Sequence, residues 1–239
     1  MGKIKLIAMD LDGTLTQHKS QLEPANRAAL DALGQKCRLV MVGAGSCERI
    51  YHQLGDYPID VIGNYGMQYG EVINGSFQLL QDDSAPVDRQ SVVQKVEFLR
   101  DKFNLHDFAG EKVEFHASGM ITFPILGTKA VLKDKLAYDP DRQKRRAMYD
   151  VVAETFADYA VFVGGTSSFD IVPHPYNKLY ALQQYAEKKG FNMDEIVYFG
   201  DDYGLGGNDE HIYKSDIKFV EMENYLDFGA KAREIEEVL

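Results

Sequence analysis

Short apolar runs alternate with amphipathic stretches in the first part of the chain. Residues 4–9, 39–42 and 61–62 are apolar runs that stop at small, polar or acidic residues, and residues 24–33 and 47–54 have helical spacing. Buried parallel strands give apolar runs of this kind, and helices that connect them cover both faces of the sheet. The pattern therefore predicts a parallel sheet with helices on both faces.

A different order of elements occupies the middle of the chain. A hairpin is predicted over residues 67–80, with Asn74-Gly75 as its tight turn, and a polar linker begins at residue 82. The next part reads helix, strand, strand and then repeats that order, which predicts a four-stranded antiparallel sheet with two helices. These elements are expected at residues 87–103, 113–115, 120–126, 140–156, 160–163 and 168–172.

The first pattern returns near the end of the chain. Residues 178–189 are predicted to be helical, and residues 195–199, which contain the apolar run 196–199, are predicted to form another strand. The chain is therefore predicted to contain an α/β core, a Rossmann-like doubly wound parallel sheet, formed by residues 1–81 and 176–239. An α+β domain of residues 82–175 is inserted into it. Ligands of such sheets bind outside the carboxyl ends of the strands, where the polar residues become candidates for function.

Composition and charge narrow the class of protein. The chain has 239 residues, of which 45% are hydrophobic, enough for one large core and a smaller one. Its formal net charge is −11, which argues against binding to nucleic acid or to anionic membranes. A phosphorylated ligand would then need a local cation, such as a bound metal.

Targeting signals and cysteines point to one compartment. Residues 4–9 are too short an apolar run for a secretory signal, and no stretch is long enough to span a bilayer. The spacing of Cys37 and Cys47 fits neither a zinc knuckle nor a redox pair, so we interpret them as small buried side chains. The sequence predicts a cytoplasmic protein.

Two aspartates directly follow the first apolar run. Asp10 and Asp12 are two residues apart at a predicted strand end, so both side chains point to the same side of the chain. One carboxylate of such a pair can attack phosphorus or hold a metal, while the other gives and takes a proton. Exposed loop acids before a turn glycine would look similar, but the preceding strand favours the functional interpretation.

A second acidic cluster follows the last apolar run. Asp201 and Asp202 come directly after it, and Asn208 and Asp209 lie a few residues further on. Oxygen ligands from two strand ends suit Mg²⁺, so this cluster and the first pair of aspartates are candidate metal ligands. The sequence leaves open which of the four residues ligate directly, and an acidic surface turn would explain the cluster taken by itself equally well.

Two weaker signals lie at predicted helix starts. Lys178 would neutralise a phosphoryl group or a nucleophilic carboxylate, although a single lysine is usually solvated. At the turn of residues 43–46, backbone amides and the Ser46 hydroxyl would bind phosphate oxygens, although a plain turn explains these residues equally well. Gly43, Ser46 and Asn177 are the candidate substrate-binding residues of the predicted core.

Taken together and in order, these features resemble the haloacid dehalogenase superfamily. The resemblance covers essentially the whole chain, and the inserted domain resembles the larger α+β cap of that superfamily. The conjunction of motifs is far more specific than any one of them. The motifs are Asp10-Leu11-Asp12-Gly13-Thr14, residues 43–46, Lys178, and Gly200-Asp201-Asp202 with Asn208-Asp209.

Within that superfamily, residues 42–46, 164–170 and 199–209 are similar to segments of the eukaryotic-type phosphomannomutases, a branch close to the Cof-like sugar phosphatases. The resemblance implies that Asp10 attacks phosphorus in line and forms an aspartyl-phosphate. It also implies that Asp12 protonates the leaving oxygen and then activates water.

The same resemblance implies a metal site and a sugar site. Mg²⁺ would be held by Asp10, the backbone carbonyl of Asp12 and Asp201. Asn208 or Asp209 would lie close to the metal. The residues that would face the sugar from the cap are Ser168 and Asp170.

The chain departs from the mutases in the arginines that bind the distal phosphate. The loop after Asp12 contains no arginine, Ala117 stands where one is expected in the cap, and the stretch after Gly127 offers only Lys129. A mutase must hold a doubly phosphorylated intermediate, which requires bidentate cationic contacts to the second phosphate. Without such contacts we expect water to be the final acceptor.

The sequence therefore predicts a Mg²⁺-dependent phosphatase that acts on a small sugar phosphate or a related metabolite. A phosphohexomutase of the phosphomannomutase type is the alternative. A catalytically idle binding protein is a third hypothesis, which the presence of Asp10, Asp12, Lys178 and Asp201 disfavours. Nucleic acid and membranes are not expected as partners, and a homodimer through the cap is possible.

Overall fold

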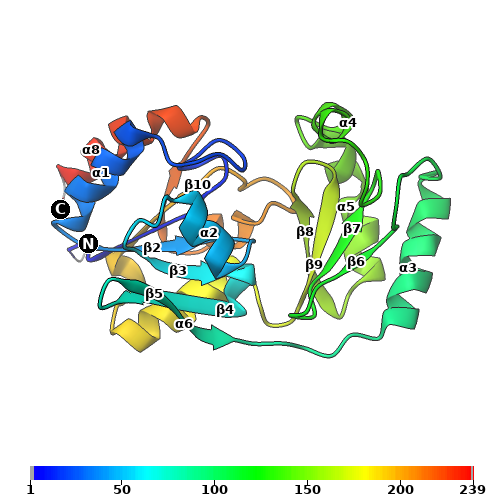
Figure 1. The fold of residues 1–239 in the computed structure, drawn as a ribbon, viewed down its shortest axis with the longest axis horizontal. Coiled ribbons are helices and arrows are strands. Elements are labelled where there is room, and N and C mark those ends of the chain that lie inside the picture. The colour runs from blue at the N-terminus through cyan, green and yellow to red at the C-terminus, as the bar shows by residue number, and fades with distance from the viewer. Residues whose placement is uncertain (1–2, 238) are drawn as a thin grey trace. The chain divides into compact units, whose positions relative to one another are not determined.

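The structure is a computed structural model that describes residues 3–237 and 239, and the chain divides into two compact units (Figure 1). Unit 1 consists of Met1–Asp82, Asn177–Tyr203 and Asp209–Leu239, and unit 2 of Asp83–Tyr176 and Gly204–Asn208. The chain therefore passes between the units four times.

Unit 1 is built on a seven-stranded sheet in the order β11-β10-β1-β2-β3-β4-β5. The first five strands in this order run parallel, whereas β4 and β5 form an antiparallel hairpin at one edge. β1 lies between β10 and β2, and all four of its residues are buried. The strands are β1 (Leu6–Met9), β2 (Arg38–Val42), β3 (Asp60–Gly63), β4 (Gln68–Ile73), β5 (Ser76–Asp82), β10 (Ile196–Gly200) and β11 (Lys218–Glu221).

Helices cover both faces of this sheet because successive strand residues point to opposite faces. On one face, Ile7 packs in a cluster with residues of α1, α2 and α8, such as Leu30 and Phe228. On the other face, Ala8 packs in a cluster with residues of α6 and α7, such as Leu182. These helices are α1 (Pro24–Gly34), α2 (Cys47–Gln53), α6 (Lys178–Lys189), α7 (Glu210–Tyr213) and α8 (Phe228–Glu236), with 3₁₀ turns at Asn64–Gly66, Met193–Glu195 and Tyr225–Asp227.

Unit 2 contains a four-stranded antiparallel sheet in the order β6-β7-β9-β8. Its core joins this sheet to α3 and α5 through buried residues such as Val96, Phe123 and Val152. The elements are α3 (Arg89–Lys102), β6 (Glu114–Phe115), β7 (Ile121–Pro124), α4 (Leu132–Tyr138), α5 (Gln143–Thr155), β8 (Tyr159–Gly164) and β9 (Ser168–Pro173).

The predicted fold class, a doubly wound parallel sheet with an additional α+β domain, is confirmed by this architecture. The pattern did not predict α4, β11, α7 or α8. Helix α4 buries none of its residues, and Leu132 and Leu136 on it are exposed, so its sequence carries no core-facing stripe. None of the described helices is long and apolar enough to cross a membrane.

Candidate active site

Asp10 lies at the carboxyl end of β1, in the middle of the sheet. Its backbone N–H donates to the carbonyl of Phe199 (2.9 Å), which continues the pairing of β1 with β10, and its side chain is largely buried. The loop that follows turns through Gly13, at a φ of +99°. A Cβ on Gly13 would lie 2.6 Å from Oδ2 of Asp201. Glycine therefore allows the loops after β1 and β10 to approach each other.

Lys178, the first residue of α6, is completely buried against two carboxylates. Its Nζ lies 2.7 Å from Oδ1 of Asp10 and 2.8 Å from Oδ1 of Asp209. Burial by itself would lower the pKa of this ammonium, but the two aspartates outweigh burial and raise the pKa. Asn177 caps the same helix, since its side-chain oxygen accepts from the backbone N–H of Tyr180 (2.9 Å). The lysine is thus a fixed cation in the site.

Asp209 is the most enclosed carboxylate of the group. Its Oδ1 accepts hydrogen bonds from Lys178 and from the hydroxyl of Tyr198 (2.6 Å), and its Oδ2 accepts from the backbone N–H of Asp202 (3.1 Å). Two donors occupy Oδ1, so Oδ2 is the oxygen with remaining acceptor capacity. Tyr198 could not be predicted from the sequence, because a tyrosine within an apolar strand is indistinguishable from a core residue.

Asp10, Asp201 and Asp209 together form a candidate metal site. Each offers a carboxylate oxygen, and these oxygens lie within 4.8 Å of one another. The hydroxyl of Thr14 donates to Oδ1 of Asp201 (3.2 Å). Burial raises the pKa of Asp10, with Asp209 and Asp201 adding to the rise while Lys178 opposes it. Three carboxylates beside one ammonium leave an excess of negative charge, and this oxygen donor set fits Mg²⁺.

The other candidate metal ligands are placed differently. The carboxylate of Asp12 is not part of this acidic group, and the ligand expected from Asp12, its backbone carbonyl, stays a prediction. Asp202 contributes its backbone N–H and C=O to hydrogen bonds with Asp209. Asn208 belongs to unit 2. Of the metal ligands predicted from the sequence, the structure thus brings together the side chains of Asp10, Asp201 and Asp209.

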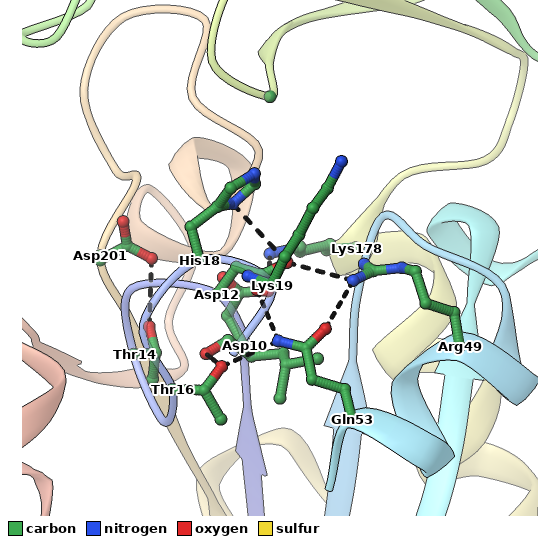
Figure 2. Close-up of polar contacts among 12 residues, drawn as sticks. Asp10, Asp12, Thr14, Thr16, His18, Lys19, Arg49, Gln53, Lys178 and Asp201 are labelled. Atoms are coloured by element: carbon green, nitrogen blue, oxygen red, sulfur yellow. Dashed lines mark hydrogen bonds and ion pairs between the residues drawn. The ribbon is translucent and has the colours of Figure 1, made fainter. Parts of the chain in front are cut away.

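The carboxylate of Asp12 faces α2 (Figure 2). Its Oδ1 accepts from Nε2 of Gln53 (2.7 Å) and from the backbone N–H of Lys19 (2.7 Å), and its Oδ2 lies 3.4 Å from Nη1 of Arg49 and 3.9 Å from Nδ1 of His18. Burial opposes the charged form, but these donors and cations outweigh it and lower the pKa of Asp12. The arrangement favours the proton-accepting form of Asp12.

The turn before α2 is shaped by close packing. Ser46 is the N-cap of α2, and its hydroxyl accepts from the backbone N–H of Arg49 (3.3 Å). A Cβ on Gly43 would lie 2.7 Å from Cδ1 of Ile50. Both candidate phosphate-binding residues thus have a structural role. Arg49 and Gln53 were not among the predicted site residues, although their spacing of four residues on a helix next to this turn places them on one face.

Two further candidates, Ser168 and Asp170, lie on β9 in unit 2. The hydroxyl of Ser168 donates to the carbonyl of Gly164 (3.1 Å). Asp170 is half-buried, and its carboxylate occupies the space that a side chain on Gly164 would need. Their proposed contact with a sugar stays a prediction.

The sequence of the chain is similar to those of known proteins. The family model for eukaryotic phosphomannomutase matches residues 27–226. The phosphomannomutase of Schizosaccharomyces pombe is 30% identical, over 87% of this chain and 84% of that protein. The phosphomannomutase of Solanum lycopersicum is 31% identical, over 90% of this chain and 87% of that protein.

Solved structures show the same fold at low sequence identity. The IMP-bound IMP-nucleotidase of Plasmodium falciparum matches with a TM-score of 0.71 and 14% identity, covering 98% of this chain and 68% of that one. A trehalose-6-phosphate phosphatase related protein matches with a TM-score of 0.52 and 15% identity, covering 98% and 97%. The chain therefore belongs to the eukaryotic phosphomannomutase family, within the haloacid dehalogenase superfamily that its motifs resemble.

Proposed function

We propose that this chain is a phosphatase of small sugar phosphates that works with Mg²⁺ through an aspartyl-phosphate on Asp10. The observation that carries the proposal is the buried Lys178, held between Asp10 and Asp209 at the carboxyl end of the central strand. A fully buried ammonium in contact with a nucleophile has the charge and position to offset a phosphoryl group.

In the proposed reaction, Asp10 is the nucleophile and Asp12 transfers protons. A carboxylate oxygen of Asp10 attacks phosphorus, the bond from phosphorus to the sugar oxygen breaks, and Asp12 gives its proton to that oxygen. Asp12 then takes a proton from water, which attacks the phosphorus of the aspartyl-phosphate and releases inorganic phosphate. Once Asp12 has given up its proton, the hydrogen bonds from Gln53 and the backbone N–H of Lys19 stabilise the carboxylate that this second step needs.

Asp10, Asp201 and Asp209 are the residues that would hold Mg²⁺. When bound there, the ion would neutralise the negative charge of the carboxylates and of the phosphoryl oxygens.

Two buried arginines of unit 2, Arg100 and Arg145, make their hydrogen bonds within that unit. The guanidinium of Arg100 donates to the carbonyls of Leu105 (2.8 Å) and Pro124 (2.7 Å). The guanidinium of Arg145 donates to Asp139 (2.9 Å) and to the carbonyl of Gly164 (2.6 Å). Both side chains are buried and engaged in holding the domain together, so neither offers a bidentate grip to a second phosphate.

A phosphohexomutase is the second candidate, and the comparisons favour it. The similar proteins named above are phosphomannomutases, and the similarity covers most of both chains. A mutase would use the same attack by Asp10, but a sugar hydroxyl would replace water as the acceptor of the phosphoryl group.

The two candidates are distinguished by their products. The purified chain would be incubated with Mg²⁺ and with mannose 1-phosphate or glucose 1-phosphate, in the presence and absence of the corresponding 1,6-bisphosphate. We expect release of inorganic phosphate. Accumulation of the 6-phosphate without free phosphate would establish the mutase instead.

An Asp10→Asn variant tests the mechanism that both candidates share. It should turn over neither these substrates nor a generic aryl phosphate, because an amide is a poor nucleophile. Activity equal to that of the wild type would disprove the role of Asp10. A wild type inactive on phosphorylated hexoses, pentoses and nucleotides would favour an idle binding protein.

A further inference from the structure

Strand β5 (Ser76–Asp82) forms one edge of the sheet in unit 1. Within the part of the chain that the structure describes, β5 pairs with β4 and no strand lies on its other side. Leu79 and Leu80 on this strand are each 46% exposed. The outer N–H and C=O groups of an edge strand can pair with the main chain of another strand.

The register of the β4–β5 hairpin shows which of these groups point outward. Both central residues of its turn have a positive φ, +53° and +79°, as in a type I′ turn. Such a turn closes with a hydrogen-bonded pair, here Ile73 and Ser76. Hydrogen-bonded and non-hydrogen-bonded pairs alternate along an antiparallel ladder, so the N–H and C=O of Phe77 and Leu79 point away from β4.

The composition of β5 does little to protect this edge. Lysine and proline commonly prevent the pairing of edge strands, but residues 76–81 contain neither, and the strand carries a single charge, at Asp82. The register with β4 shifts once, between Leu79 and Gln81, so residues 76–79 are the regular part of the edge. Phe77 and Leu79 therefore offer their main-chain groups from a regular, uncharged stretch of strand.

A groove lies between β5 and helix α2. Its volume is about 510 Å³, and residues of both elements line it, among them Glu48, Tyr51, His52, Phe77 and Leu79. The rings of Tyr51 and Phe77 stack with their centres 4.5 Å apart, so Phe77 points toward α2. Leu79 lies two residues further along the strand and therefore on the same face. Alternate side chains of a strand added to β5 would point into this α2–β5 groove.

The charges at the α2–β5 groove are acidic. The side chain of Glu48 is 84% exposed, and that of Asp56, just after α2, is 61% exposed. His52 lies between them, 3.9 Å from Glu48 and 2.7 Å from Asp56. Among the described residues that line the groove there is no lysine or arginine. Charge complementarity favours a basic occupant over a second copy of this chain, which carries the same net charge of −11.

We propose that β5 and the α2–β5 groove bind an extended, basic segment of a partner protein, which adds to the sheet as a further strand. Its main chain pairs with Phe77 and Leu79. Its alternate side chains face α2, where an apolar residue packs against Leu79 and basic residues lie near Glu48 and Asp56. The inference goes beyond the proposed function, since it concerns a surface for a protein partner.

A synthetic peptide serves as the probe. It is a fluorescein-labelled heptapeptide with lysine, valine and lysine at its second, fourth and sixth positions and threonine elsewhere, so that one face carries the apolar and basic side chains. Fluorescence anisotropy with the full chain should show saturable binding. Leu79→Lys should weaken this binding by about tenfold or more, because it places a like charge beside the peptide. Absence of saturable binding to the wild type would overturn the inference.

Leu226→Lys is the matched control variant. Leu226 is a leucine of unit 1 that is 61% exposed and does not line the groove. This variant has the same change in charge and should bind the peptide like the wild type. An equal loss of affinity in both variants would show a general charge effect and overturn the assignment to β5.

N-methylated peptides test the pairing of the main chains. In a strand, the N–H groups of alternate residues point to opposite sides, so either the threonine amides or the lysine and valine amides face β5. One peptide would be methylated at the first set of amides and one at the second. We expect one of them to bind about tenfold more weakly or worse and the other to bind like the parent. Equal affinities of the two methylated peptides would contradict strand addition.

The nature of the occupant is tested by charge reversal and by oligomeric state. A peptide with glutamate in place of both lysines should bind about tenfold more weakly or worse, and equal affinity would overturn the choice of a basic partner. Analytical ultracentrifugation tests the alternative of a second copy. A wild type that is dimeric, and that becomes monomeric in Leu79→Lys but not in Leu226→Lys, would show that β5 pairs with itself and overturn the inference.

Discussion

At the scale of single residues, the candidate site depends on the hydrogen bonds and ion pairs that compensate its buried charges. Asp209 accepts from Lys178, Tyr198 and the backbone of Asp202, so all its partners come from unit 1. Groups that hydrogen-bond to metal-ligating side chains orient them, and their loss commonly weakens metal binding. We therefore expect Tyr198, whose hydroxyl donates to Asp209, to affect metal binding.

We predict that Tyr198→Phe weakens Mg²⁺ binding by about tenfold or more, because Oδ1 of Asp209 loses a donor and the carboxylate can rotate. Calorimetric titration with Mg²⁺ measures this without turnover. Tyr185→Phe is the matched control, since the Tyr185 hydroxyl donates to Oδ2 of Asp60 at the same distance, 2.6 Å, outside the candidate metal site. Equal Mg²⁺ affinity in both variants would refute the role of Tyr198.

A second residue-scale prediction concerns the pH dependence of Asp12. Gln53→Ala removes a hydrogen bond that favours the carboxylate, so the pKa of Asp12 should rise toward its ordinary value. Asp12 must be unprotonated to activate water. The acidic limb of the pH–rate profile of hydrolysis should therefore move to higher pH. In the wild type, the lowered pKa contributes stability above the unfolded pKa of Asp12 that is lost as pH falls through the folded value.

The measurement for this variant is the pH profile of phosphoenzyme hydrolysis, with Gln35→Ala as control because Gln35 is exposed at the end of α1. An acidic limb that stays in place in Gln53→Ala would show that Asp12 is not the base.

At the scale of elements, strand ends were predictable and side-chain partners were not. The apolar runs locate β1 and β10, and adjacent parallel strands bring Asp10 and Asp201 to one edge of the sheet. Arg49 and Tyr198 could not be identified in this way. A charged residue on a short helix is usually solvated and an aromatic residue in a strand is usually part of the core. Their partners Asp12 and Asp209 lie 37 and 11 residues away, outside the helix and the strand that carry them.

The loop after β1 gives a prediction at this scale. Gly13→Ala should destabilise the chain by more than about 2 kcal/mol and weaken Mg²⁺ binding, because it adds backbone strain and a clash with Asp201. Gly75→Ala is the control. Gly75 also has a positive φ, +79°, but a Cβ there meets nothing within 4 Å, so it should show the strain alone, about 1 kcal/mol. Urea unfolding measures the free energy of unfolding of both variants. An equal decrease in the two would contradict the crowding at Gly13.

At the scale of the whole molecule, the two units differ in what a metal can stabilise. All three candidate ligands belong to unit 1. Mg²⁺ at about 100 times its Kd should therefore add about 2.7 kcal/mol to the stability of unit 1. Hydrogen exchange with and without a chelator measures this unit by unit, and Asp201→Asn should reduce the effect. Equal protection of unit 2 would argue against a site confined to unit 1.

The segment Gly204–Asn208 leaves unit 1 directly after the loop that carries Asp201 and joins unit 2, where the carbonyl of Gly206 accepts from the backbone N–H of Val163 (2.8 Å). Cutting the chain at residues 82 and 177 would therefore not release unit 2 intact. In a chimaera that exchanges this domain between relatives, residues 83–176 would lack the short stretch that accepts this hydrogen bond from β8. A successful graft has to carry this stretch from the same parent as the domain, or match it by design.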